Sequence, residues 1–416
     1  MRKATLIPLL IIIVGVCLAL AGFAAGGMKT LWFDRVGFHL APPAAPLAPT
    51  PPTPPAAPDA PDAPVPPEVP VPPEAPSLWG WAKGFWFERG GSSAANLGSL
   101  ITVDESYDSF SSITLNADFI GSVTLKEGSG YAVRGQNYER FGGLNARLDG
   151  ETLYVDATRD RRWMRYSFDG LFGSAERDTW VEITYPKGAD LSLVNADLSA
   201  GRINASGLDC EELYIDNSFG RIDVSTVLCD RLTVNSASGD TQLAGINVRG
   251  NAVVDNDFGN VSLTNIIAGS LTVDLNAGNA KVTGVTAESL SVSNDFGKIG
   301  LKDIETDSLR LNLNSGDLEA ESIKTFDLFA KSSFGLVRFD RLELSGRAEI
   351  DQSSGDVNIS LDLREDDLSY ELGTDAGNVN IDGRRSGNSV YNRNTEAEAS
   401  LSVTSNFGNI TLKFLK

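Results

Sequence analysis

Apolar and polar residues alternate in short runs that recur from Asp197 to Leu363, and these runs predict β-strands. The second and fourth positions after a glycine are apolar, as Val261 and Leu263 are after Gly259. The seventh and fifth positions before a glycine are apolar as well, as Leu232 and Val234 are before Gly239. Successive side chains on a strand point to opposite faces, so each run predicts a strand with one face turned inward.

The glycines themselves recur at intervals of 19 or 20 residues and define a repeat. They are Gly201, Gly220, Gly239, Gly259, Gly278, Gly297, Gly316, Gly335 and Gly355, and the series continues less regularly to Gly377 and Gly408. A fixed period of this size is typical of solenoids, in which each repeat buries its apolar side against its neighbours. The period predicts an all-β fold, a parallel β-helix whose coils stack about 4.8 Å apart.

A second pattern, with a period of two coils, lies just before these glycines. The residue directly before the glycine is Phe in every other coil and Ala or Ser in the coils between. Two positions before that residue, the coils with Phe have a polar residue, whereas most coils with Ala or Ser have Leu. Positions two apart on a strand share a face, so we expect large and small side chains to interlock inside the solenoid. The predicted core stack is Phe219, Phe258, Leu275, Phe296, Leu313 and Phe334.

The first residues predict a membrane anchor. Arg2 and Lys3 precede an apolar run from Leu6 to Ala25, which is long enough to span a bilayer with its N-terminus in the cytoplasm. A signal peptide cleaved near Ala21 is the alternative. We expect residues 1–27 to form a transmembrane helix, so that the protein is a single-pass protein of the cell membrane with its folded region outside the cytoplasm.

Four further segments separate this anchor from the repeats. Residues 28–40 predict an interfacial collar, and residues 41–76, with 17 of the 19 prolines, predict a semi-rigid spacer of roughly 100 Å. The aromatic-rich segment 77–99 predicts either a cover for one end of the fold or a bilayer contact. Residues 100–190 predict an irregular β entry region, and residues 191–416 the solenoid proper.

Composition excludes several classes of function. A formal net charge of −20 argues against nucleic acid as a partner, because phosphate binding requires a basic face. His39, in the collar, is the single histidine, so Ser-His or Cys-His catalysis of the usual kind is excluded from the repeats. We expect a protein without a cofactor that is not an enzyme. The alternatives are a polysaccharide-active enzyme, because parallel β-helices host sugar-cleaving enzymes that use paired carboxylates, and a purely structural spacer.

A basic and aromatic cluster interrupts this acidic chain at Arg161, Arg162, Trp163 and Arg165. As a surface contact it would take an anionic partner, so a cell-envelope polymer, a lipid surface or an envelope protein is the expected class. The alternative is a hairpin that caps the solenoid.

Two sets of potential ligands fall on adjoining coils. Asp255, Asp257 and Asp274 predict either a cation site, since Ca²⁺ prefers oxygen ligands, or ordinary turn residues that bond to local backbone. Cys210 and Cys229 are 19 residues apart and predict stacked thiols, either free or joined in a disulfide.

The run Val181–Gly188, with the sequence VEITYPKG, leads into serial Ser-Gly-Asp, Phe-Gly-Asn and Ala-Gly-Asn turns. Over roughly residues 100–416 the chain resembles a bacterial family of β-strand-repeat domains of unknown function, described as "putative adhesins". The resemblance implies a right-handed β-helix-like fold and, through some relatives, a link to envelope stress responses. The family has no agreed catalytic residues, so the resemblance assigns none here.

Overall fold

The computed structural model describes residues 31–34, 37–40, 98–158 and 178–416 in two compact units, Met1–Trp81 and Ala82–Lys416. In the first unit, β1 (Leu31–Asp34) and β2 (Gly37–Leu40) form an antiparallel hairpin. The anchor, the spacer, most of the aromatic-rich segment and the basic cluster at 161–165 lie outside the described residues, so these stay predictions. No helix within the described ranges has the length and apolar character needed to cross a membrane.

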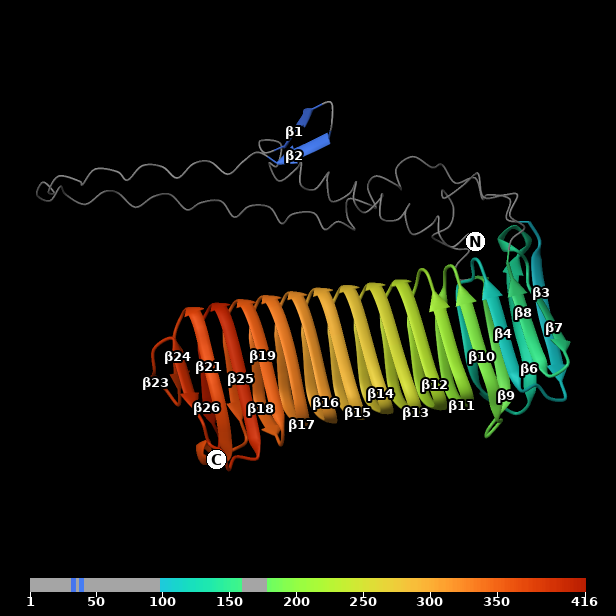
Figure 1. Cartoon of the computed structure of the whole chain (residues 1–416). Coiled ribbons are helices and arrows are strands. Elements are labelled where there is room, and N and C mark those ends of the chain that lie inside the picture. The colour runs from blue at the N-terminus through green and yellow to red at the C-terminus, as the bar shows by residue number, and fades with distance from the viewer. Residues whose placement is uncertain (1–30, 35–36, 41–97, 159–177) are drawn as a thin grey trace, which may run out of the picture. The chain divides into compact units, whose positions relative to one another are not determined.

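The second unit is a solenoid in which each coil consists largely of one long, bent strand (Figure 1). Consecutive coils pair in parallel, with Val261 beside Ala280 and Ala280 beside Ile299. The central strands are β10 (Leu191–Leu198), β11 (Arg202–Asn217), β12 (Ile222–Ser238), β13 (Thr241–Phe258), β14 (Val261–Ala277), β15 (Ala280–Phe296), β16 (Ile299–Ser315), β17 (Leu318–Phe334), β18 (Val337–Leu344), β19 (Arg347–Ser354) and β20 (Val357–Leu361). The all-β, mostly parallel solenoid predicted from the period is confirmed, whereas its right-handed winding stays a prediction.

A positive φ marks two bends in each coil from Gly201 to Arg341. The first is the repeated glycine, where φ lies between +121° and +150°. The second comes six residues later, where Gly245, Asn265 and Asp303, for example, have φ of 65°, 55° and 54°. Glycine tolerates such angles at little cost, and Asn and Asp tolerate the second better than most residues. The coil of 20 residues from Gly239 to Gly259 takes up its extra residue as a register shift between Val248 and Asn251.

The interior is a single apolar core that runs through all coils. In the coil that begins at Gly259, the buried apolar side chains come from positions two, four, seven, nine, twelve, fourteen and sixteen after the glycine. Those residues are Val261, Leu263, Ile266, Ala268, Leu271, Val273 and Leu275. Because each coil contacts only its neighbours, burial of this face holds the stack together.

The predicted core stack is wrong in its aromatic part. Leu275 and Leu313 are buried, but Phe219, Phe258, Phe296 and Phe334 are exposed. The strand alternation stops between the third residue before the glycine, which points inward, and the residue directly before it, which lies at the start of the corner. In the coils that carry an exposed phenylalanine, the inward position two residues earlier is filled by a buried polar residue, such as Asn256 or Asn294.

At the N-terminal end the coils are stacked out of sequence order. The strands there are β3 (Leu100–Tyr107), β4 (Ser112–Ala117), β5 (Ser122–Gly128), β6 (Tyr131–Tyr138), β7 (Asn145–Asp149), β8 (Thr152–Ala157) and β9 (Trp180–Pro186). β4 lies between β8 and β10, and β5 lies between β9 and β11. The entry region thus supplies two genuine coils. Antiparallel pairing of β6 with β9 and of β7 with β8 covers strand edges that would otherwise be open.

The C-terminal end repeats this arrangement. Its strands are β21 (Leu368–Ala376), β22 (Val379–Ile381), β23 (Arg384–Arg385), β24 (Ser389–Asn392), β25 (Ala399–Phe407) and β26 (Ile410–Phe414). The last coil to be reached along the chain, β25 and β26, inserts between β19–β20 and β21–β22. The antiparallel strands β23 and β24 then cover the outermost coil.

Candidate functional site

A row of phenylalanines runs along one corner of the solenoid. Its members are Phe219, Phe258, Phe296, Phe334 and Phe407, and their side chains are 54%, 38%, 60%, 59% and 63% exposed. Strand register alternates each ring with a small residue: Phe258 is beside Ala277, Ala277 beside Phe296, and Phe296 beside Ser315. We call these five residues the phenylalanine row.

The backbone beneath the row is fixed by the glycine corner. The N–H of Gly278 donates to the carbonyl of Phe296 at 2.9 Å, and Asn294 Nδ2 donates to the carbonyl of Gly278 at 2.9 Å. Asn217, Asn256 and Gln352 make the same side-chain bond to the glycine of the preceding coil. These buried amides stand where Leu275 and Leu313 stand in other coils, and they tie the coils that carry Phe219, Phe258 and Phe296 to their neighbours.

A column of amides and carboxylates borders the row on the other side of the glycines. Asn260 donates from its backbone N–H and from Nδ2 to Asp240 Oδ1, at 2.9 and 3.1 Å. Asn279 repeats both bonds to Asn260 at 3.2 and 3.1 Å. Asn409 bonds to Asp356 in the same way near the C-terminal end. The corner therefore presents rings beside an ordered polar edge.

Of the predicted cation ligands, the structure brings two side by side. Asp255 and Asp274 are register partners on β13 and β14, and Asp257 lies two residues from Asp255. Partial desolvation, followed by the charges of Asp257 and Asp274, raises the pKa of Asp255. Within the described ranges, however, no three His, Cys, Asp or Glu side chains are grouped as a metal ion would need. Asp257 instead accepts a hydrogen bond from Asn276.

The two cysteines stack as predicted. Cys210 and Cys229 are register partners on β11 and β12, both are buried, and both are free thiols. The hydrogen bond with Cys229, together with burial, raises the pKa of the Cys210 thiol. Both thiols lie inside the core, so neither is placed to attack a molecule in solution.

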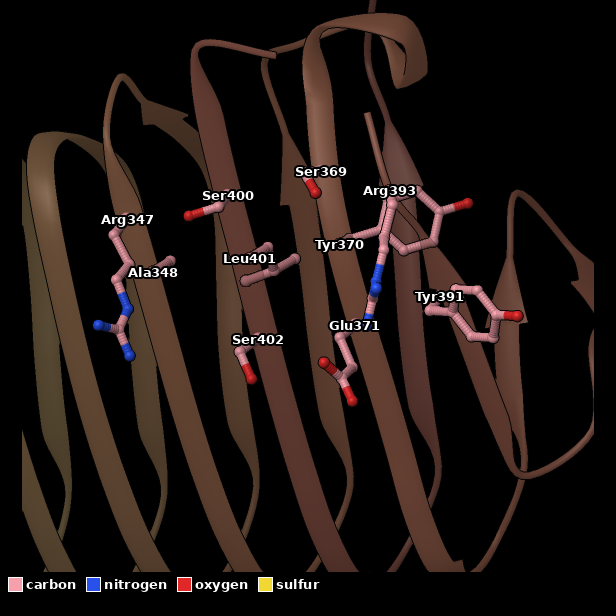
Figure 2. A pocket seen from close by; sticks show the side chains of 10 residues that line it. All are labelled: Arg347, Ala348, Ser369, Tyr370, Glu371, Tyr391, Arg393, Ser400, Leu401 and Ser402. Atoms are coloured by element: carbon pink, nitrogen blue, oxygen red, sulfur yellow. The ribbon is translucent and has the colours of Figure 1, made fainter. Parts of the chain in front are cut away.

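A hollow of about 420 Å³ lies on the C-terminal coils. Figure 2 shows Arg347 on one side of β25 and Arg393 with Tyr391 on the other, with Ser400 and Ser402 between them. Arg347 is already paired with Glu349, at 2.6 Å. The Tyr370 hydroxyl donates to Glu365 at 2.8 Å, and desolvation followed by this bond raises the pKa of Tyr370 to about 12. The hollow is open and its charges are mixed.

The sequence pattern predicts the period of the phenylalanine row correctly, but the rings lie on the outside of the solenoid and not, as predicted, on the inside. The signal that identifies the outside was present, because Asn217, Asn256 and Asn294 occupy the inward position two residues earlier. The hollow could not have been found, since the insertion of β25 that forms it leaves no local pattern in the sequence.

Several solved structures are similar to this chain at low identity. A "putative adhesin" from Bacteroides fragilis is 10% identical, covers 76% of this chain and 97% of its own, and has a TM-score of 0.30. A "putative lipid binding protein" from Parabacteroides distasonis is 12% identical, with coverage of 75% and 97% and a TM-score of 0.31. A "putative cell adhesion protein" from Clostridium sporogenes is 9% identical, with coverage of 76% and 99% and a TM-score of 0.17.

A comparison with curated proteins gives no match. The description Toastrack DUF4097 fits the chain twice, at residues 110–274 and 253–413. These two overlapping matches extend from β4 to β26 and include both out-of-order ends. Because they span well over half of its length, the chain belongs to the Toastrack DUF4097 family.

Proposed function

We propose that this protein is a non-enzymatic binding module that is tethered to the cell membrane and displayed outside the cytoplasm. The observation that carries the proposal is the phenylalanine row, five exposed rings on a rigid sheet corner. Soluble proteins rarely leave extended apolar surface in water unless it contacts something. The similar structures are named for adhesion and for lipid binding, which is in keeping with this class of function.

Repetition favours binding over catalysis. An active site needs a few different side chains converging on one reacting atom. The corner instead repeats the same ring on alternate coils, beside Asn-to-Asp or Asn-to-Asn bonds between neighbouring coils. Such an array offers many equivalent weak contacts, which together give an extended partner high affinity.

The tether follows from the apolar run at Leu6–Ala25 and the spacer at 41–76. Alkaline carbonate extraction of cell membranes tests it. We expect the full chain to stay in the membrane pellet, whereas a chain lacking residues 1–27 should be released. Release of the full chain would contradict the tether.

The binding role is tested by sedimentation of the purified full chain with isolated bacterial envelope fragments and, separately, with vesicles of neutral and anionic phospholipid. We expect the folded protein to sediment with envelope fragments, and heat-unfolded protein serves as the control for non-specific adhesion. Failure to sediment with envelope fragments and with both kinds of vesicle would overturn the proposal.

A further inference from the structure

We infer that the phenylalanine row is a set of subsites for one extended, uncharged glycan chain. This inference rests on the proposed binding function and names both its surface and its ligand class. Three features of the corner point to such a ligand: the spacing of the rings, the polar edge beside them and the charge around them.

The spacing of the rings matches a ligand that repeats. Rings on alternate coils are about 9.6 Å apart, twice the separation of neighbouring strands, and the five rings span about 38 Å. Small residues such as Ala277 and Ser315 lie between them and leave a step at every second coil. Extended β-linked glycans repeat every two sugars over a comparable length, and the C–H face of a pyranose packs on the face of an aromatic ring.

The edge of the row supplies the hydrogen bonds that sugars need. Each hydroxyl of a sugar both donates and accepts, so it pairs best with a surface that offers both functions. The side chains of Asn260, Asn279 and Asn409 supply donors and acceptors, and Asp240 and Asp356 supply further acceptors. These side chains are held in place by one another, so a ligand does not have to order them.

The charge of the corner disfavours the other occupants. Three positions of each coil lie close to the row: the fourth and the second residue before the glycine and the first residue after it. Over all coils, acidic residues outnumber basic ones at these positions. The acidic residues are Asp197, Asp216, Asp240, Asp255, Asp257, Asp274, Asp295, Asp317, Asp351, Asp356 and Asp375, and the basic residues are Arg202, Arg221, Lys298 and Lys331. An anionic lipid or polymer would be repelled, and a second copy docked corner to corner would oppose like charges. An uncharged chain meets neither penalty.

Calorimetric titration of the purified full chain tests the inference. The probes are cellohexaose and chitohexaose, with their disaccharides, and with heparin and polylysine as charged polymers. We expect at least one hexasaccharide to bind at least ten-fold more tightly than its disaccharide, because the longer chain reaches more than one ring. Binding should change little between 50 and 500 mM salt, since no charge pairing is involved.

The decisive variant is Phe258→Ser combined with Phe296→Ser and Phe334→Ser. It should fold, because Ser238, Ser315 and Ser354 occupy the same column in the natural chain. We expect it to lose at least ten-fold in hexasaccharide affinity with an unchanged melting temperature. The matched control is Phe326→Ser, which removes a ring that is 55% exposed outside the row and should leave affinity unchanged.

Three results would overturn the inference. They are no binding of either hexasaccharide, equal binding by the triple variant, and row-dependent binding of polylysine or heparin in place of the sugars. Envelope sedimentation of the triple variant separates the two proposals. If the native chain binds neither hexasaccharide while both proteins still sediment with envelope fragments, the binding function stands and this assignment of ligand and surface fails.

Discussion

At the scale of single residues, the glycine corner leaves almost no room for a side chain. A Cβ on Gly239 would lie 1.7 Å from the carbonyl oxygen of Gly220, and one on Gly278 would lie 1.8 Å from that of Gly259. The positive φ at both positions adds backbone strain for any other residue. Glycine is therefore required here by contact between coils as well as by the turn.

We predict that Gly239→Ala destabilises the protein by about 3 kcal/mol or more, because the new methyl group has to push two coils apart. Chemical denaturation measures the change in the free energy of unfolding. Gly130→Ala is the matched control, since a Cβ at Gly130 meets no atom within 4 Å. Equal stability of the two variants would contradict the close stacking of the corner.

A second prediction concerns Asp255, whose pKa is raised by desolvation and by the charges of Asp257 and Asp274. A raised folded-state pKa means that ionisation of Asp255 destabilises the fold as the pH rises through that pKa. We therefore expect Asp255→Asn to raise the melting temperature at pH 7. The gain should vanish below the ordinary carboxyl pKa of 3.8, where the side chain is protonated in both states.

Thermal melts between pH 3 and pH 8 make this measurement, with the exposed Asp190→Asn as control. Calcium provides the opposing test. If millimolar Ca²⁺ raised the melting temperature of the native chain but not that of the Asp255→Asn variant, the three carboxylates would form a cation site after all.

At the scale of the element, local alternation predicts a strand but not where its alternation ends. The positions after each glycine and around Leu232 and Val234 lie inward as the pattern required. The last two residues before the glycine do not continue the alternation, because the chain is already turning there. Whether a ring at this point faces inward or outward depends on how the chain turns at the corner. In the sequence, the outward orientation is indicated only by the polar residue two positions earlier, such as Asn256 or Asn294.

The cysteine pair tests the register of β11 and β12 directly. We predict that iodoacetamide leaves Cys210 and Cys229 unmodified in the native protein and alkylates both after denaturation without a reductant, because both thiols are buried and free. Peptide mass spectrometry reads the result, with a fully reduced sample as control. A cross-linked peptide that appears only before reduction would show a disulfide instead.

At the scale of the whole molecule, the period predicted the stack but not its ends. Repeats read in order imply that coils follow one another in space. Instead, β4–β5 stack between two coils that come later in the chain, and β25–β26 stack between two coils that come earlier. These insertions depend on pairing between residues far apart in the sequence, such as Asp351 with Thr404, which are 53 positions apart. No pattern within one repeat contains that information.

We predict that deletion of residues 399–416 opens the C-terminal end of the solenoid. Without β25 and β26, the edges of β19, β20 and β21 lose their parallel partners. Hydrogen exchange in β19 and β21 should become faster by roughly ten-fold or more, which corresponds to a local loss of about 1.4 kcal/mol. Exchange in β13 should stay unchanged. Removal of Leu415 and Lys416 alone is the control, and an equal effect from both deletions would contradict the inserted coil.

The position of β25 and β26 also bears on biosynthesis. β25 and β26 fill a slot between strands made earlier, so β19 to β22 cannot reach their native pairing while β25 and β26 are still inside the ribosomal exit tunnel. Until then β19 and β21 each present a bare edge to other chains. The closing step of folding therefore comes only once β26 has left the tunnel, and a nascent chain stalled before that point would expose two unpaired strand edges.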